Sequence, residues 1–221
     1  MVEEFLSPDE LALLNDEITR HYAPLELSAS PNGKTRADGL PDTECEVIFW
    51  NPVEEKVQAF LDLMTKPELV GLTASILGNA YEESQGSLVM YSALGGKGQA
   101  WHQDCPFDAE NYNVNRLFYV NDLREEDGAI VVVPGSHRTG RIPAGGAQEP
   151  IEGEVMLTPK AGSLVLVHGC CFHRVTPNVS KRPRVSVNFR VFPAGSDSSV
   201  CKVGVYRNVS IDFRNKVVAQ E

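Results

Sequence analysis

From about residue 85 onward, the chain consists of short β-rich runs separated by glycine, proline, asparagine and aspartate. The runs are residues 87–94, 116–121, 129–133, 154–157, 163–168, 171–175, 184–192 and 200–206. Short strands at this spacing, with turn residues between them, are typical of an antiparallel sandwich or barrel. This part of the chain therefore predicts an all-β core.

Helices are expected in the first third. Ser7-Pro8-Asp9-Glu10 has the pattern of a helix start, with a capping serine, a proline at the first helical position and a glutamate that closes a capping box. A second helix is expected to begin at Asn51-Pro52, and a third at Pro67 with its end at Gly78. Residues 23–44 contain several prolines and glycines and predict a loop.

Charge and composition narrow the class of partner and the location. The 221 residues carry a formal net charge of −10, which disfavours nucleic acids and anionic membranes as partners. No apolar run approaches the roughly 20 residues of a membrane helix, and the N-terminus lacks a signal-peptide pattern. The 5 cysteines form no CxxC motif, which favours a reducing cytoplasm. We expect a cytoplasmic protein, monomeric or homodimeric, whose partner is a small molecule.

The segment Trp101-His102-Gln103-Asp104 is a candidate metal motif. Residues two apart on a strand share a face, so His102 and Asp104 would present an imidazole and a carboxylate together. A second histidine from another strand would complete the ligand set that proteins use for non-haem Fe(II). His-x-Asp alone occurs often by chance, so the motif needs support from elsewhere in the chain.

The run at 184–192 alternates strictly. Arg184, Ser186, Asn188 and Arg190 share one face, and apolar residues occupy the other. This pattern allows two interpretations: a half-buried strand with its polar face in water, or a polar pocket inside a barrel. In a pocket, an arginine is well suited to bind a carboxylate through two parallel hydrogen bonds.

Taken in order, the motifs resemble the phytanoyl-CoA dioxygenase-like family of Fe(II)- and 2-oxoglutarate-dependent oxygenases. The matching pieces, within residues 85–192, are His102-Gln-Asp104, Asp127-Gly128 with Pro134-Gly135-Ser136-His137, Gly162 to His168, and His173 with Pro177-Asn178, Ser180 and Arg184. The resemblance implies a double-stranded β-helix, or jelly roll, with flanking helices. We therefore expect one domain over residues 1–221, with a helical buttress at 1–80 and a jelly-roll core at 85–210.

The resemblance also implies roles for particular residues. His102, Asp104 and His173 would be the iron ligands, and Arg184 would bind the distal carboxylate of 2-oxoglutarate. Further co-substrate contacts would come from Gln99, Tyr91 and Ser186. Ile130 stands where some relatives carry threonine, which removes one co-substrate hydrogen bond. The cofactors implied are Fe(II), 2-oxoglutarate and O₂, with ascorbate as a candidate reductant.

His168 is the main rival for the third ligand. The residue eleven positions after His168 is Val179, which cannot bind a carboxylate, whereas the residue eleven positions after His173 is Arg184. His173 is therefore preferred. His137 lies in a turn sequence, where anchoring of the loop is a sufficient role. His21 ends the first helix, where capping of the helix is a sufficient role.

The reaction implied is hydroxylation of an unactivated C–H bond of a small molecule, with release of succinate and CO₂. The substrate class includes natural products, amino acids and acyl compounds. An aspartate at position 104 favours hydroxylation over halogenation, because no coordination position is vacated for chloride. Desaturation or ring formation at the same site stays open, as does a metal-binding jelly roll without turnover. A cupin-type dioxygenase would be expected to carry a histidine cluster on one strand, such as His-x-His, and this sequence contains no such motif.

Overall fold

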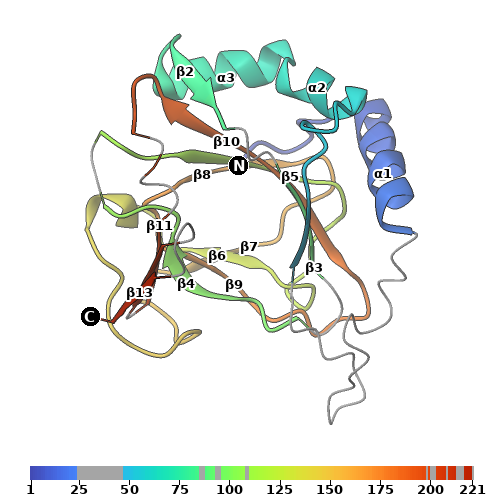
Figure 1. The fold of residues 1–221 in the computed structure, drawn as a ribbon. Coiled ribbons are helices and arrows are strands. Elements are labelled where there is room, and N and C mark those ends of the chain that lie inside the picture. The colour runs from blue at the N-terminus through green and yellow to red at the C-terminus, as the bar shows by residue number, and fades with distance from the viewer. Residues whose placement is uncertain are drawn as a thin grey trace.

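Two antiparallel sheets face each other, and helices cover the outer side of one of them (Figure 1). The computed structural model describes residues 1–23, 47–84, 88–92, 96–107, 110–197, 199, 203–207, 209–212 and 217–220. The loop expected at 23–44 lies outside these residues, apart from its first position.

The sheet under the helices has six strands in the described part of the chain, in the order β1-β3-β10-β5-β8, with β2 paired to one end of β10. Their bounds are β1 Val47–Trp50, β2 Tyr81–Glu83, β3 Leu88–Ser92, β5 Val114–Tyr119, β8 Leu164–His168 and β10 Arg184–Pro193. The long strand β10 is central and pairs with both β3 and β5.

The opposite sheet has seven described strands, in the order β13-β12-β11-β4-β9-β6-β7. Their bounds are β4 Gln99–Gln103, β6 Ile130–Val132, β7 Val155–Leu157, β9 His173–Val175, β11 Val203–Tyr206, β12 Val209–Asp212 and β13 Val217–Gln220. Consecutive strands thus often lie in different sheets, as a jelly roll requires. The all-β core with flanking helices is confirmed. Strands β1, β2, β12 and β13 were not expected from the sequence.

The helices are α1 Pro8–Tyr22, α2 Gln58–Met64 and α3 Pro67–Leu77. The capping box of α1 is present: the Glu10 N–H donates to Ser7 Oγ at 3.2 Å, and the Ser7 N–H donates to the Glu10 carboxylate at 2.7 Å. The expected start of α2 at Asn51-Pro52 is wrong. Asn51 Oδ1 accepts the Glu54 N–H at 3.2 Å in a separate turn, and the helix begins only at Gln58.

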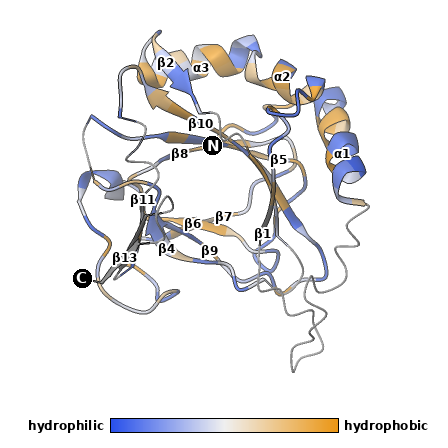
Figure 2. Cartoon of the chain, viewed as in Figure 1, coloured by the Kyte–Doolittle hydropathy of each residue, from blue (hydrophilic) through white to orange (hydrophobic). Residues whose placement is uncertain are grey.

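The main hydrophobic core lies between the helices and the first sheet. Val185, Val187 and Phe189 of β10 are buried there with residues of α1, α2 and α3. Figure 2 shows hydrophobic residues along β10 and along the helices that cover it. Because the apolar face of β10 is used in this core, its polar face lies between the two sheets. The pocket interpretation of the alternating run is therefore the correct one. Among the described residues, no helix is both long and apolar enough to cross a membrane.

Candidate metal centre

His102, Asp104 and His173 come together between the sheets. His102 lies on β4 and His173 begins β9, and the two are register partners across the strand pair. Asp104 follows β4, where its N–H donates to Gly169 O at 2.8 Å and ties this segment to the chain just before β9. One ligand atom from each of the three residues lies within 4.8 Å of the others.

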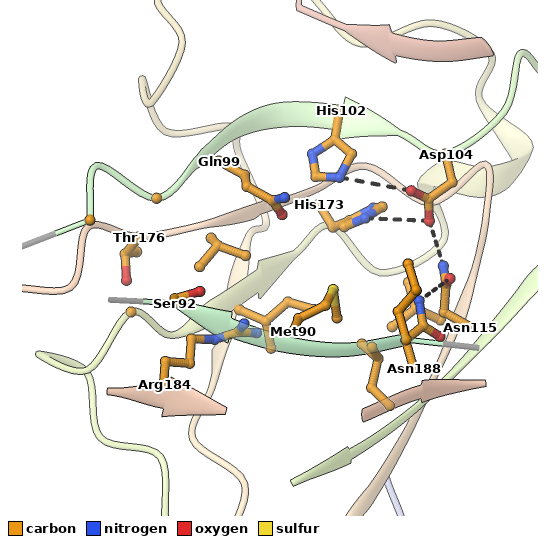
Figure 3. A pocket seen from close by; sticks show the side chains of 18 of the residues that line it. Met90, Ser92, Gln99, His102, Asp104, Asn115, His173, Thr176, Arg184 and Asn188 are labelled. Atoms are coloured by element: carbon orange, nitrogen blue, oxygen red, sulfur yellow. Dashed lines mark hydrogen bonds and ion pairs between the residues drawn. The ribbon is translucent and has the colours of Figure 1, made fainter. Parts of the chain in front are cut away.

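The Asp104 carboxylate faces both imidazoles (Figure 3). Its Oδ1 is 3.9 Å from His102 Nε2, and its Oδ2 is 3.7 Å from His173 Nε2. The centroids of the two imidazole rings are 4.0 Å apart. Three potential ligand atoms thus converge on one small volume from two strands.

Backbone carbonyls fix the tautomers of both histidines. His102 Nδ1 is 2.8 Å from Ala100 O, and His173 Nδ1 is 2.8 Å from Cys171 O. A carbonyl oxygen only accepts, so each Nδ1 carries a proton, and in the neutral tautomer each Nε2 has its lone pair toward the centre. Burial, together with the neighbouring His173, lowers the pKa of His102 to about 4. His102 is therefore neutral at physiological pH, the form that binds metal.

Asp104 is held as an anion. Burial by itself would raise the pKa of this carboxyl group, but the pKa lies well below its usual range, with the positive charge of Arg190 as the largest opposing cause and the hydrogen bond from Asn115 adding to it. Arg190 Nη2 is 3.3 Å from Asp104 Oδ1, and Asn115 Nδ2 donates to Asp104 Oδ2 at 2.5 Å. Two imidazole nitrogens and one carboxylate form a donor set that fits Fe(II) with open coordination positions.

A cavity of about 420 Å³ contains this cluster. Its polar wall includes Gln99, Asn115, Arg184, Asn188 and Arg190 in addition to the three candidate ligands. Its apolar wall includes Leu88, Met90, Leu117, Ile130, Val167 and Val175. A mostly apolar cavity with a few convergent polar groups is typical of a small-molecule site.

Arg184 lies at the other end of the cavity from Asp104 (Figure 3). The residue is only 6% exposed. Its guanidinium donates to Ser186 Oγ at 3.3 Å and to Tyr119 Oη at 3.5 Å, and its Nε has no partner among the described residues. No described carboxylate forms an ion pair with it. A buried cation of this kind suits an anionic ligand such as the distal carboxylate of 2-oxoglutarate.

Gly128 makes room for the Arg184 side chain. Its φ is +91°, and a Cβ there would lie 3.4 Å from Arg184 Cδ and 3.2 Å from Thr176 O. A side chain at this position would therefore be strained, would crowd Thr176 O and would come into contact with the arginine.

The other co-substrate candidates are placed differently. Gln99 lines the cavity and points into it (Figure 3). Ser186 is fully buried and contacts Arg184, so any effect on a ligand would pass through the arginine. Tyr91 lies on the opposite face of β3, where it packs against Tyr22 with ring centroids 4.7 Å apart. Alternation along β3 sends Met90 into the cavity and Tyr91 toward α1, so the structure does not support contact of Tyr91 with the co-substrate.

The remaining histidines lie outside the cluster. His168 stacks on Tyr112 at 4.3 Å between centroids, and its Nδ1 accepts the Cys170 N–H at 3.1 Å. His137 lies beside His168, with ring centroids 5.0 Å apart. His21 stacks on Trp50 at 4.0 Å. The geometry thus favours His173 over His168 as the third ligand.

Two further residues of the site, Asn115 and Tyr206, were not expected from the sequence. Asn115 reaches Asp104 from the facing sheet, and Tyr206 stacks on His102 with centroids 5.1 Å apart. Asn115 is a polar residue beside the apolar run at 117–120, a weak signal that it faces a site. Tyr206 ends an expected strand and carries no local signal of its role.

This chain is similar to a known protein family and to curated proteins. A family model described as phytanoyl-CoA dioxygenase matches residues 1–186. An L-proline trans-4-hydroxylase of Streptomyces griseoviridis is 33% identical over 90 residues, which are 36% of this chain and 32% of that protein. The match to this relative thus spans about a third of its length. An ectoine dioxygenase of Nocardia farcinica is 24% identical and covers 87% of this chain and 72% of its own.

Solved structures share the fold. The epimerase SnoN, in complex with Fe³⁺, alpha ketoglutarate and nogalamycin RO, superposes with a TM-score of 0.64 at 19% identity and covers 93% of this chain and 80% of its own. HygX from Streptomyces hygroscopicus, with nickel and 2-oxoglutarate bound, has a TM-score of 0.67 at 12% identity and covers 88% of this chain and 82% of its own. At these identities the likeness concerns the fold, and it confirms the jelly roll expected from the sequence.

Proposed function

This chain belongs to the phytanoyl-CoA dioxygenase family, and on that premise we propose that it is a non-haem Fe(II)- and 2-oxoglutarate-dependent oxygenase of a small molecule. The family expected from the sequence is thereby confirmed. The observation that supports the activity is the presence of His102, Asp104, His173 and Arg184 in one cavity. We propose these four residues as the metal and co-substrate site.

The iron would be held by Nε2 of His102, Nε2 of His173 and the carboxylate of Asp104. When bound together with O₂, the iron and 2-oxoglutarate supply an oxidation that releases succinate and CO₂. The protein contributes two imidazoles whose Nδ1–H groups are held by carbonyls, so that each Nε2 is turned toward the metal position.

Arg184 would bind the far carboxylate of 2-oxoglutarate and so set the orientation of the keto acid. Ser186 and Tyr119 hold the guanidinium through their hydroxyl groups. Leu117, Ile130 and Val167 line the same cavity and give it an apolar wall, from which a bound ligand would displace water. A dry cavity strengthens the pairing of charges and protects reactive species from side reactions.

The substrate is proposed to be a small molecule that is hydroxylated at an unactivated C–H bond. The curated relatives include proteins named for proline and for ectoine, and both are small molecules. Desaturation and ring formation would use the same residues. A single domain, a cytoplasmic location and a monomeric or homodimeric state stay predictions from the sequence.

Anaerobic titration with Fe(II) and 2-oxoglutarate tests this proposal. Chelation of the keto acid to iron gives a visible charge-transfer band, and we expect this band in the wild-type protein. Succinate should then form on admission of O₂, faster with a true substrate from a panel of amino acids and small natural products. Correctly folded protein without the band would contradict the proposal. A band without succinate for any substrate would favour a metal-binding jelly roll without turnover.

A further inference from the structure

We propose that Asn115 is a positioning residue for the metal ligand Asp104, held in its working orientation by Arg190 and Asn188. This inference rests on the proposed function, because it concerns the same candidate metal site. One neutral amide from the facing sheet fixes the orientation of the Asp104 carboxylate, so that metal affinity depends on a residue that does not itself contact the metal.

The sheet register brings the residues together. Asn115 on β5 and Arg190 on β10 are register partners in the sheet under the helices. Asp104 belongs to the opposite sheet, after β4. The hydrogen bond from Asn115 Nδ2 to Asp104 Oδ2, at 2.5 Å, therefore links the two sheets across the cavity (Figure 3).

Two donors determine which way the Asn115 amide faces. Its Oδ1 accepts from Asn188 Nδ2 at 2.9 Å and from Arg190 Nε at 3.0 Å. An arginine Nε only donates, so the group beside it must be the amide oxygen. The amide nitrogen must then face Asp104. Arg190 thus settles which atom of the amide is oxygen and which is nitrogen, and Asn188 adds a second donor that holds the amide in this orientation.

Both oxygens of Asp104 are restrained by this arrangement. Oδ2 accepts from Asn115, and Oδ1 lies 3.3 Å from Arg190 Nη2. The imidazoles of His173 and His102 lie on the other side of the same two oxygens. Terminal torsions of aspartate are broad, so without these donors the carboxylate could rotate away from the imidazoles. Hydrogen bonds of this kind orient metal ligands and commonly change metal affinity by 10–100-fold.

Replacing Asn115 tests the positioning role better than replacing Arg190 does. Loss of Arg190 would remove a positive charge that repels a metal cation, and this would oppose the loss of orientation. Asn115 is neutral, so its replacement removes its hydrogen bonds to Asp104, Asn188 and Arg190 without changing charge. Leucine has nearly the same size and shape but offers no donor.

The experiment compares Asn115→Leu, Asn188→Ala and the control Asn15→Ala. Asn15 also donates one side-chain hydrogen bond, to Val120 O at 3.1 Å, but it lies on α1 away from the cavity. Each metal-free protein is titrated with Co(II), and visible absorption gives both the dissociation constant and the ligand-field spectrum. Thermal unfolding of the metal-free proteins reports whether each variant is folded.

We expect Asn115→Leu to bind Co(II) roughly 10–100-fold more weakly than wild type and with an altered spectrum. Asn188→Ala removes one of the two donors that orient the amide, so its affinity should fall between those of wild type and Asn115→Leu. Asn15→Ala should match wild type in affinity and spectrum, whatever its stability. A purely structural role for Asn115 would change the unfolding temperature without changing the Co(II) spectrum.

The possible failures are distinct. If wild-type protein is folded but binds no Co(II), the proposed function itself is contradicted. If wild type binds Co(II) and folded Asn115→Leu binds it with the same affinity and spectrum, only the positioning role is overturned. If Asn115→Leu does not fold, the Co(II) titration of Asn188→Ala becomes the deciding measurement. A Co(II) affinity equal to that of wild type in Asn188→Ala would overturn the inference.

Discussion

His102 and His173 are register partners on adjacent strands, and their ring centroids are 4.0 Å apart. The pairing of β4 with β9 therefore places both imidazoles on the cavity side of one sheet, although the two residues are far apart in the chain. Asp104 faces both Nε2 atoms, so the candidate metal site requires all three side chains.

The first prediction is that His173→Ala abolishes specific metal binding. Loss of this imidazole leaves one histidine and one carboxylate, too few ligands to hold a divalent ion in competition with water. His168→Ala is the matched control, because His168 stacks on Tyr112 outside the cluster. Calorimetric titration with Fe(II) under anaerobic conditions measures both. Retained binding in His173→Ala with loss in His168→Ala would reverse the ligand assignment.

The second prediction concerns Arg184→Leu. This variant should weaken 2-oxoglutarate binding by roughly 2–5 kcal/mol, the usual cost of removing one partner of a buried ion pair, while Fe(II) binding is kept. The ligand-free variant should be no less stable than wild type, since Arg184 is buried without a described acid partner. Thermal unfolding with and without 2-oxoglutarate tests both points, because a ligand that binds only the folded state raises the unfolding temperature.

Arg116→Leu is the control for that experiment. Arg116 is also buried, but it pairs with Glu83 at 2.5 Å on the side of the sheet that faces the helices. Its loss should destabilise the fold and leave the affinity for 2-oxoglutarate unchanged. If Arg184→Leu bound 2-oxoglutarate as tightly as wild type, the proposed role of Arg184 would be wrong.

The sequence was most informative where a residue's role follows from local spacing. His-x-Asp, the alternation along β10 and the capping box at Ser7 each depend on residues a few positions apart, and the structure contains all three features. Tyr91 was misplaced because alternation predicts that neighbours face opposite sides but not which side faces the cavity. The side was set by the helices, which cover the face of β3 that carries Tyr91.

Asn115 could not be assigned from the sequence for a different reason. Its role depends on the distance between two sheets and on the register of β5 with β10, and neither leaves a local pattern. The start of α2 was misjudged because Asn-Pro can open a turn as readily as a helix, and here Asn51 caps a turn that ends before Gln58.

The third prediction is that Gly128→Ala weakens 2-oxoglutarate binding more than metal binding. The new Cβ would lie 3.4 Å from Arg184 Cδ, and alanine is strained at the φ of +91° found here. The three atoms nearest to this Cβ belong to Thr176, Arg184 and Asn178, and none of them to a candidate metal ligand. Gly135→Ala provides the control, since its φ of +82° carries the same strain but a Cβ there meets nothing within 4 Å. Equal losses of 2-oxoglutarate affinity in the two variants would show that strain alone is responsible.

The last prediction is a loss of stability of the metal-free protein as the pH falls from 7 to 5. Burial and the neighbouring His173 lower the pKa of His102 to about 4, below the value of about 6.5 expected in the unfolded chain. Between these two values the unfolded state binds more protons, so the stability contributed by neutral His102 is complete above pH 6.5 and is lost as the pH falls toward 4. The shift corresponds to about 2 kcal/mol between pH 7 and 5.

Urea unfolding at several pH values, with a chelator present, measures this dependence in wild type and in His102→Asn. The variant lacks the titrating group, so its free energy of unfolding should fall by about 2 kcal/mol less over the same interval. Bound metal should not reduce the dependence in wild type, since a ligated Nε2 takes up no proton in the folded state while the unfolded chain still does. Parallel pH profiles for the metal-free wild type and variant would mean that His102 is not held neutral by its surroundings.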